Sequence, residues 1–213
     1  LNNDNNDDLV IGHSEGAVID VMLGNGDGTF GAPAQYTAEF FPYAAWIGHL
    51  DGDAYRDIVT ANRSAGTVSV LLNDGDGTFG AAINTAADQS YVISGADMDG
   101  DLDNDIVTAG HHTAGQITVL YNDGAGALGN PTTIGVGDYP YAVYAGDLDN
   151  DGDNDIAVAF EVDTANVAVI ENLDNTGFAA PVYFKVGIES NTVTAADLDN
   201  DGLPELIVVN EES

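Results

Sequence analysis

The sequence has no cysteine, only three basic residues and no long apolar run. Without cysteine there is no disulfide framework and no thiol chemistry. Without a run of about 18 apolar residues, no membrane-spanning helix is expected, and we expect no membrane insertion. The basic residues Arg56, Arg63 and Lys185 face 36 acidic ones, which gives a formal net charge of −33. Nucleic acids and anionic membrane surfaces are therefore poor partners for this chain.

The composition is nevertheless that of a folded protein. Apolar residues make up 44% and aromatic residues 8% of the 213 residues, enough for one domain or several small repeated units. The charge is patterned, because twenty of the 36 acids fall in five Asp-rich loops. Four bound divalent ions would still leave about −25. An acidic surface suited to high salt is therefore an alternative source of part of the charge.

An Asp-rich stretch recurs along the whole chain. Its clearest copy is 147–155, with aspartate at every second position, followed at once by the apolar run 156–159. The last acid of the five copies falls at 48- to 50-residue intervals, at Asp8, Asp57, Asp105, Asp155 and Glu205. A glycine-rich turn runs in step, and its apolar member recurs at 30, 79, 128 and 178. Two independent signals with one period establish an internal repeat.

Each repeat predicts four short strands. In the fourth repeat these are 141–145, 156–160, 167–170 and 180–186, all separated by turn residues. The second of them is continuously apolar, as expected of a strand buried on both faces. No stretch has a helical period. A unit of about 50 residues with four strands is typical of one blade of a β-propeller, so we predict an all-β propeller fold.

The motif Asp-x-Asp-x-Asp-Gly-x-x-Asp before an apolar strand, with Gly-Thr-Phe-Gly at 28–31 and 77–80, resembles the FG-GAP or VCBS repeat. This is the repeat of integrin α-subunit propellers and of many secreted bacterial proteins. The resemblance covers essentially the whole chain and implies that the Asp loop joins the innermost strand of a blade to the second strand. Counted by Asp loop, the single region 1–213 divides into 1–48 (partial), 49–96, 97–146, 147–196 and 197–213 (partial).

About 4.3 repeats are fewer than the roughly seven or eight blades common in such propellers. Leu1 also falls inside a motif, so we expect a part of a larger propeller, or an assembly completed by self-association. The alternative is a closed four-bladed ring in which a strand at 191–196 completes the first sheet. That ring would leave the apolar run 207–210 without a place.

The Asp loops predict Ca²⁺ sites, because clustered carboxylates repel one another and calcium accepts six to eight oxygen ligands. They are not EF-hands, since position twelve from Asp147 is Val158, inside a predicted strand. We expect side-chain ligands at positions one, three, five and nine and a carbonyl ligand at position seven. Three well-formed sites follow: Asp97, Asp99, Asp101, Asp105 and the carbonyl of Asp103; Asp147, Asp149, Asp151, Asp155 and the carbonyl of Asp153; Asp197, Asp199, Asp201, Glu205 and the carbonyl of Leu203.

Two further loops are degenerate or truncated. His49 replaces the opening acid of the second loop and Ala54 its glycine, so a site there is weak or empty. The weaker candidate ligands in these two loops are Asp51, Asp53, Asp57, Asp4 and Asp8. The competing interpretation is that such loops are ordinary Asp/Gly turns.

Strand alternation places the loops on two faces. The loops after the first and third strands of each blade share one face, and those after the second and fourth share the other. The second face collects aromatic and basic side chains that suit a glycan or a protein partner: the segment 88–91 and Phe41, Tyr43, Arg63, His111, Tyr139 and Tyr141. The plainer alternative is that aromatic residues next to proline cover strand ends.

No catalytic motif is present, so we predict that the protein is not an enzyme. The favoured function is a calcium-stabilised adhesion or recognition module, secreted or at the cell surface, where calcium is plentiful. Two alternatives stay open: a structural unit of a calcium-dependent surface layer or filament, and the non-catalytic propeller of a larger secreted polysaccharide-active enzyme.

Overall fold

The computed structural model describes residues 1–87, 90–161 and 166–212, and every regular element in these ranges is a β-strand. The predicted all-β class is thus confirmed. No membrane-spanning helix occurs within these ranges. The strands are β1 (Leu9–Gly12), β2 (Val18–Met22), β3 (Ala34–Thr37), β4 (Pro42–Gly48), β5 (Asp57–Asn62), β6 (Thr67–Leu71), β7 (Ile83–Ala86), β8 (Ser90–Ala96), β9 (Asp105–Gly110), β10 (Gly115–Asn122), β11 (Leu128–Gly137), β12 (Pro140–Gly146), β13 (Asp155–Phe160), β14 (Val167–Ile170), β15 (Val182–Phe184), β16 (Ile188–Ala196) and β17 (Glu205–Glu212).

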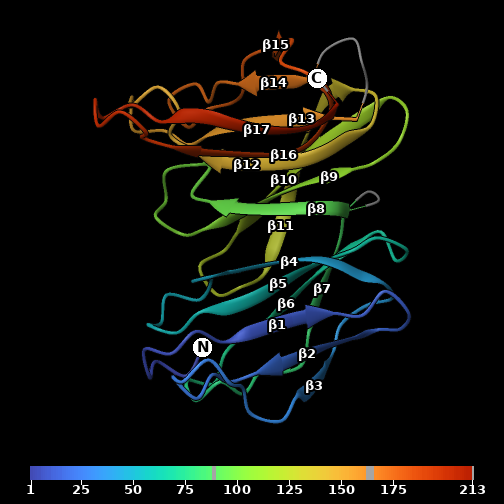
Figure 1. The fold of residues 1–213 in the computed structure, drawn as a ribbon, viewed down its shortest axis with the longest axis vertical. Helices are drawn as coiled ribbons and strands as arrows, with labels where there is room; N and C mark the ends of the chain where they lie inside the picture. The colour runs from blue at the N-terminus through green and yellow to red at the C-terminus, as the bar shows by residue number, and fades with distance from the viewer. Residues whose placement is uncertain (88–89, 162–165, 213) are drawn as a thin grey trace.

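The strands form five antiparallel sheets that follow chain order (Figure 1). Three sheets have four strands each: β4-β5-β6-β7, β8-β9-β10-β11 and β12-β13-β14-β15. A three-stranded sheet, β1-β2-β3, precedes them and the pair β16-β17 follows them. Sequential pairing follows from the short turns, because antiparallel neighbours need only a few connecting residues. The strands predicted in the fourth repeat correspond to β12, β13, β14 and a shorter β15.

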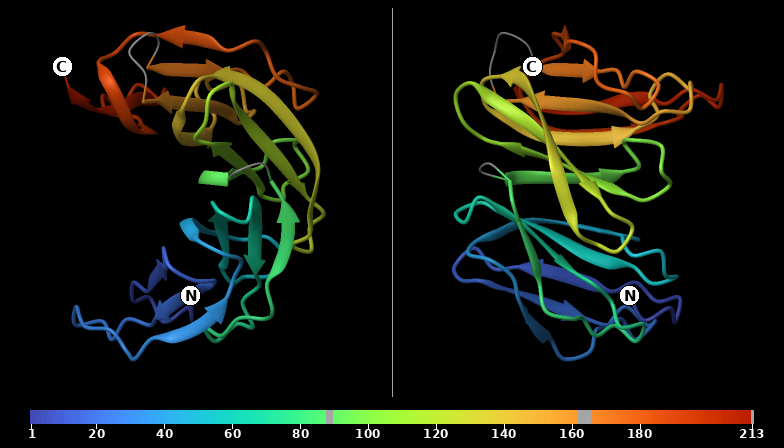
Figure 2. Two further views of the ribbon diagram at one scale, coloured as in Figure 1. Left: turned by 90° about the vertical axis from the view of Figure 1, so that its right-hand side faces the viewer. Right: turned by 180° about the vertical axis from the view of Figure 1, so that it is seen from behind.

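The sheets lie one after another along an open arc, with the two termini in its end sheets (Figure 2). The strand at 191–196 belongs to β16, which pairs with β17 from Ala196↔Glu205 onward. The ring in which this strand completes the first sheet is therefore wrong for this structure. The run 207–210, which that ring left without a place, lies in β17.

The second strand of each four-stranded sheet is its most buried part. All six residues of β5, of β9 and of β13 are buried. Their unbroken apolar runs fit this position, because a strand covered on both faces has no need of polar alternation. Successive sheets pack face to face: Ile106 of β9 shares a buried cluster with Val59 of β5, and Val107 shares another with Ile156 of β13.

The first strands of successive sheets, β4, β8, β12 and β16, lie next to one another on the inner side of the arc (Figure 2). Each of them begins near the loop after the second strand and ends at an Asp loop. A seven-residue strand such as β4 is about 20 Å long. The two sets of loops are therefore held at opposite ends of the inner strands.

Candidate functional site

Each complete Asp loop is shaped by its opening acid. The carboxylate oxygens of Asp97 accept backbone hydrogen bonds from Gly100 (2.7 Å) and Leu102 (2.9 Å). Asp147 and Asp197 accept the equivalent pairs from the fourth and sixth residues of their own loops. These fourth and sixth residues have positive φ, for example 78° at both Gly100 and Leu102. Short side-chain-to-backbone bonds of this kind fold a tight turn without regular secondary structure.

The closing acid ties the loop to the rest of its sheet. Asp105 is fully buried and accepts hydrogen bonds from the backbone N–H groups of Met98 (2.7 Å) and Asn122 (2.8 Å). Asp57 and Asp155 make the same two bonds in their repeats. Burial raises the pKa of Asp105 to about 7 and raises the pKa of Asp57 and of Asp155 in the same direction. Ionising these carboxylates is costly unless a cation compensates the charge.

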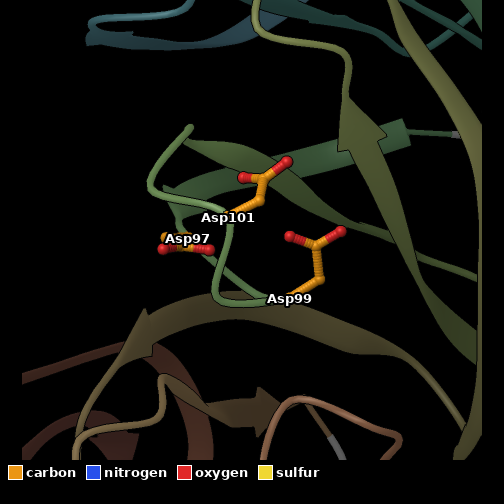
Figure 3. Close-up of side chains that lie close together, drawn as sticks. All are labelled: Asp97, Asp99 and Asp101. Carbon is orange, nitrogen blue, oxygen red and sulfur yellow. The ribbon is translucent and has the colours of Figure 1, made fainter.

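Three groups of acids have ligand oxygens within 4.8 Å of one another: Asp97, Asp99 and Asp101; Asp147, Asp149 and Asp155; Asp197, Asp199 and Glu205. Figure 3 shows the first group, which comes from a single short loop. Carboxylate oxygens are hard donors, and such a set fits Ca²⁺ or Mg²⁺ better than a metal that prefers nitrogen or sulfur. The described residues therefore contain three acid clusters that can hold a metal ion.

The grouping does not unite every predicted ligand. Asp105, Asp151 and Asp201 stay outside the groups of their loops. At position seven, the Asp153 carboxylate accepts a hydrogen bond from the Asn175 side chain (2.5 Å), and Leu203 is exposed. The carbonyls of Asp103, Asp153 and Leu203 stay predicted ligands.

The loops at 1–8 and 49–57, both within the described ranges, form no such group. In the second loop the His49 ring takes the place of the opening carboxylate and bonds to the Tyr55 carbonyl at 2.8 Å. In the first loop Asp8 pairs with the amino group of Leu1 and Asp4 with Asn6. Asp51 and Asp53 accept backbone hydrogen bonds from their own turn, as Asp149 and Asp101 do in theirs, so the second loop differs by its missing opening acid.

A repeated asparagine, not singled out from the sequence, links the loops of neighbouring sheets. The Asn122 amide donates to the carbonyl of Leu50, in the preceding Asp loop, at 2.7 Å and to that of Asn104 at 3.1 Å. Asn172 and Asn73 make the same contacts with Met98 and with Leu1. The signal was available: asparagine opens the glycine-rich turn at 73, 122 and 172.

At the other end of the inner strands, all six residues predicted for ligand binding come together. Tyr43 stacks on Tyr91 with ring centroids 4.3 Å apart, and Tyr91 contacts His111 (5.1 Å) and Tyr141 (5.4 Å). We call the whole set the aromatic cluster: Phe41, Tyr43, Tyr91, His111, Tyr139 and Tyr141, with Arg63 over it. Of the predicted segment 88–91, residues 88–89 lie outside the described ranges.

Polar groups border the aromatic cluster. The Arg63 guanidinium carbon lies 5.0 Å from the Tyr91 ring centre and 5.8 Å from that of Tyr43. His111 bonds to the Glu161 carboxylate at 2.5 Å, and the Tyr91 hydroxyl donates to that of Tyr43 at 2.8 Å. Burial raises the pKa of the Tyr91 phenol, so this hydroxyl stays protonated at neutral pH.

The cluster is built from equivalent positions of the repeat. Tyr43, Tyr91 and Tyr141 are each the second residue of the first strand of a sheet. Phe41 (φ 67°) and Tyr139 (φ 54°) occupy the equivalent corner before β4 and β12. Aromatic residues seldom adopt a positive φ, and backbone strain of this kind concentrates at functional sites. The corner is held by hydrogen bonds between Phe41 and Arg63 and between Tyr139 and Glu161.

The comparisons with known proteins identify the family. The model of the FG-GAP-like repeat matches residues 49–108, 97–158 and 151–208, and the chain therefore belongs to the FG-GAP-like repeat family. Among curated protein sequences, none matches the chain significantly.

Two similar solved structures share the fold. The chain resembles a structure of the Tc holotoxin pore of Photorhabdus luminescens, with 19% identity and a TM-score of 0.50 over 92% of this chain and 11% of that one. It also resembles the V. cholerae biofilm matrix protein Bap1, with 17% identity and a TM-score of 0.51 over 94% of this chain and 34% of that one. The chain thus spans a minor part of each of these larger proteins.

Proposed function

We propose that the chain is a calcium-stabilised, non-catalytic β-propeller module that recognises a glycan or a protein outside the cell. The observation that carries the proposal is the separation of two sites along the inner strands. Acid clusters lie at one end and the aromatic cluster lies at the other. In this arrangement the metal fastens the framework, and the loops at the opposite end are free to contact a partner.

Three observations support calcium as a fastener. The acid clusters offer only oxygen donors, and the buried closing acids have raised pKa values that a divalent cation would offset. The third loop also sits between two sheets, where the Asn172 side chain joins it to the turn of the next sheet. A cation bound to the folded state only stabilises it by about 2.7 kcal/mol per site at a hundredfold excess over Kd.

The propeller and the extracellular location rest on the family and the fold. The four-stranded antiparallel sheets repeat along an arc, and a four-stranded antiparallel sheet is the structure of one propeller blade. One structural neighbour is named as a biofilm matrix protein, and a matrix lies outside the cell. Calcium is abundant there, which suits weak carboxylate sites.

The metal part is tested by thermal unfolding of metal-free protein with increasing Ca²⁺. We expect the melting temperature to rise with Ca²⁺, and Asp147→Asn to reduce that rise. Asp51→Asn is the matched control, because its loop lacks the opening acid and forms no acid group. An unchanged melting temperature across the Ca²⁺ series would refute the fastener role.

The recognition part is tested by screening glycan and extracellular-protein arrays with the Ca²⁺-loaded chain. We expect binding that is lost when Tyr141 is replaced by alanine and kept when Asp51 is replaced by asparagine. A screen without any hit would favour a purely structural role.

A further inference from the structure

The Arg63 guanidinium is the most unusual charge in the molecule. The chain carries 36 acids and three basic residues, yet no carboxylate of the described ranges lies within ion-pair distance of Arg63. Arg63 is exposed and rests over three rings of the aromatic cluster instead, those of Phe41, Tyr43 and Tyr91. Arginine stacked on aromatic rings keeps the edge of its planar fork free for a carboxylate.

A second polar group with the opposite chemistry borders the same rings. Besides Tyr43, the Tyr91 ring also contacts the ring of His111. His111 in turn bonds to the exposed carboxylate of Glu161. Arg63, His111 and Glu161 each follow the second strand of three successive sheets, so they form a row across the inner strands. Along this row a hydrogen-bond donor of fixed positive charge is followed by a ring nitrogen and then by an acceptor carboxylate.

The apolar floor between these groups is partly open. Tyr43 is 43% exposed. Tyr91 beside it is buried, and the stacking of the two rings fixes the ring of Tyr43 in place. A rigid aromatic surface with a few polar groups at its edge is the usual composition of a site for a small ring-shaped ligand.

We propose that the aromatic cluster binds a uronic-acid residue of an acidic polysaccharide. The sugar carboxylate pairs with the Arg63 guanidinium, the sugar ring lies against Tyr43, and sugar hydroxyls donate to Glu161. This inference rests on the proposed recognition function and specifies its ligand class.

An acidic peptide fits the same residues less well. A peptide that uses several carboxylates needs several cations, and the row offers only Arg63 as a permanent one. Its other charged member, Glu161, repels carboxylates but accepts hydrogen bonds from hydroxyl groups. A ligand unit with one carboxylate and several hydroxyls satisfies both ends of the row. The net charge of −33 disfavours polyanions in general, so the contact depends on the local attraction of Arg63 within the roughly 8 Å over which exposed charges are not screened at physiological salt.

The test measures binding of the Ca²⁺-loaded protein to hyaluronan oligosaccharides by calorimetry at physiological salt. We expect binding to the oligosaccharide, none to its carboxyl-reduced neutral form, and weaker binding to poly-glutamate. Arg63→Gln should reduce the affinity at least about tenfold, as expected for loss of a charge-assisted bond. Arg56→Gln changes the net charge equally but lies in an Asp loop at the other end of the inner strands, so it should stay within about twofold.

Arg63→Lys separates charge from geometry, because lysine keeps the charge but not the planar fork, and it should bind between wild type and Arg63→Gln. Equal losses in Arg63→Gln and Arg56→Gln would show non-specific attraction and overturn the inference. Binding that is unaffected by Arg63→Gln but lost in Asp147→Asn would assign the contact to a calcium bridge. Binding to poly-glutamate alone would assign the cluster to acidic peptides. If no acidic polymer binds while array hits depend on Tyr141, the ligand class is wrong and the recognition function stands.

Discussion

The side-chain amide of Asn122 donates a 2.7 Å hydrogen bond to the carbonyl of Leu50, 72 residues earlier in the chain. Leu50 lies in the Asp loop of one sheet, and Asn122 begins the turn after the third strand of the next. The same amide also reaches Asn104, in the Asp loop of its own sheet. One buried side chain therefore joins the second and third Asp loops, of which the third holds an acid cluster, to one turn.

Removing this link should loosen the contact between two sheets. Asn122→Ala removes this donor from the buried carbonyl of Leu50 and from the half-buried carbonyl of Asn104, and we expect it to lower the free energy of unfolding by about 1–3 kcal/mol. Urea unfolding in excess Ca²⁺ measures this. Asn191→Ala, which removes an exposed hydrogen bond to Glu211, should cost less than about 0.5 kcal/mol. Equal costs for the two variants would show that the link contributes nothing.

The metal-free protein should lose stability as pH rises. Burial raises the pKa of Asp105 to about 7 and raises the pKa values of Asp57 and Asp155, so the folded state holds these protons more tightly than the unfolded chain. Their contribution is complete below about pH 4 and is lost as pH rises toward 7. Thermal melts of metal-free protein between pH 4 and pH 7.5 should show this fall, which Asp105→Asn should reduce.

The acids of the glycine-rich turns change the stability of the fold with pH in the opposite direction, and they do so at lower pH. Hydrogen bonds from Thr29 and Thr78 lower the pKa values of Asp27 and Asp76, so their small contribution to stability disappears only as pH falls below about 4.

Calcium should reverse the loss of stability that the metal-free protein shows as pH rises, because the cation favours the ionised Asp loops. A metal-free stability that increases from pH 5 to pH 7 would contradict the assignment of the buried closing acids.

Much of the strand order and of the two loop faces could be predicted from the sequence, because the same weak patterns recur in every repeat and support one another. The strand positions follow from apolar runs such as 156–159, and the two loop faces follow from strand alternation alone. The aromatic set was found in the same way, since Phe41, His111 and Tyr139 fall on one face in any antiparallel register. The asparagine link was not found, because its partners are 72 to 74 residues apart and depend on how the sheets pack.

Metal geometry was also beyond the sequence. The ligand pattern predicts four carboxylates per loop, whereas three acids gather in each of the three complete loops, and these include the closing acid in the fourth and fifth loops but not in the third. Asp105 and Asp155 accept the same two backbone hydrogen bonds, so these bonds do not decide which acids gather. The pattern of acids alone does not contain that information.

Leu102 carries a strain that a single substitution should relieve. It occupies the sixth position of the third loop, where the equivalent residues are Gly152 and Gly202, and its φ is 78°. Its side chain is 90% exposed, so little burial is lost on truncation. Leu102→Gly should therefore raise the free energy of unfolding by about 1 kcal/mol. Chemical unfolding with and without Ca²⁺ measures the gain. Leu198→Gly, at a position that is also exposed but without positive φ, should be neutral or destabilising.

Trp46 offers a direct report on how two sheets meet. It is the only tryptophan of the chain, and its indole lies against Gly48 of its own strand and Gly95 of the neighbouring sheet, where an added Cβ would collide with the ring. Gly95→Ala should therefore displace the indole, lower the melting temperature and shift the fluorescence maximum toward longer wavelength, because overpacking costs about 1–3 kcal/mol. Gly135→Ala in β11, where a Cβ meets nothing within 4 Å, is the control. An unchanged spectrum in Gly95→Ala would mean that the first strands of the two sheets are not in close contact, and the row from Arg63 to Glu161 would then lose its basis.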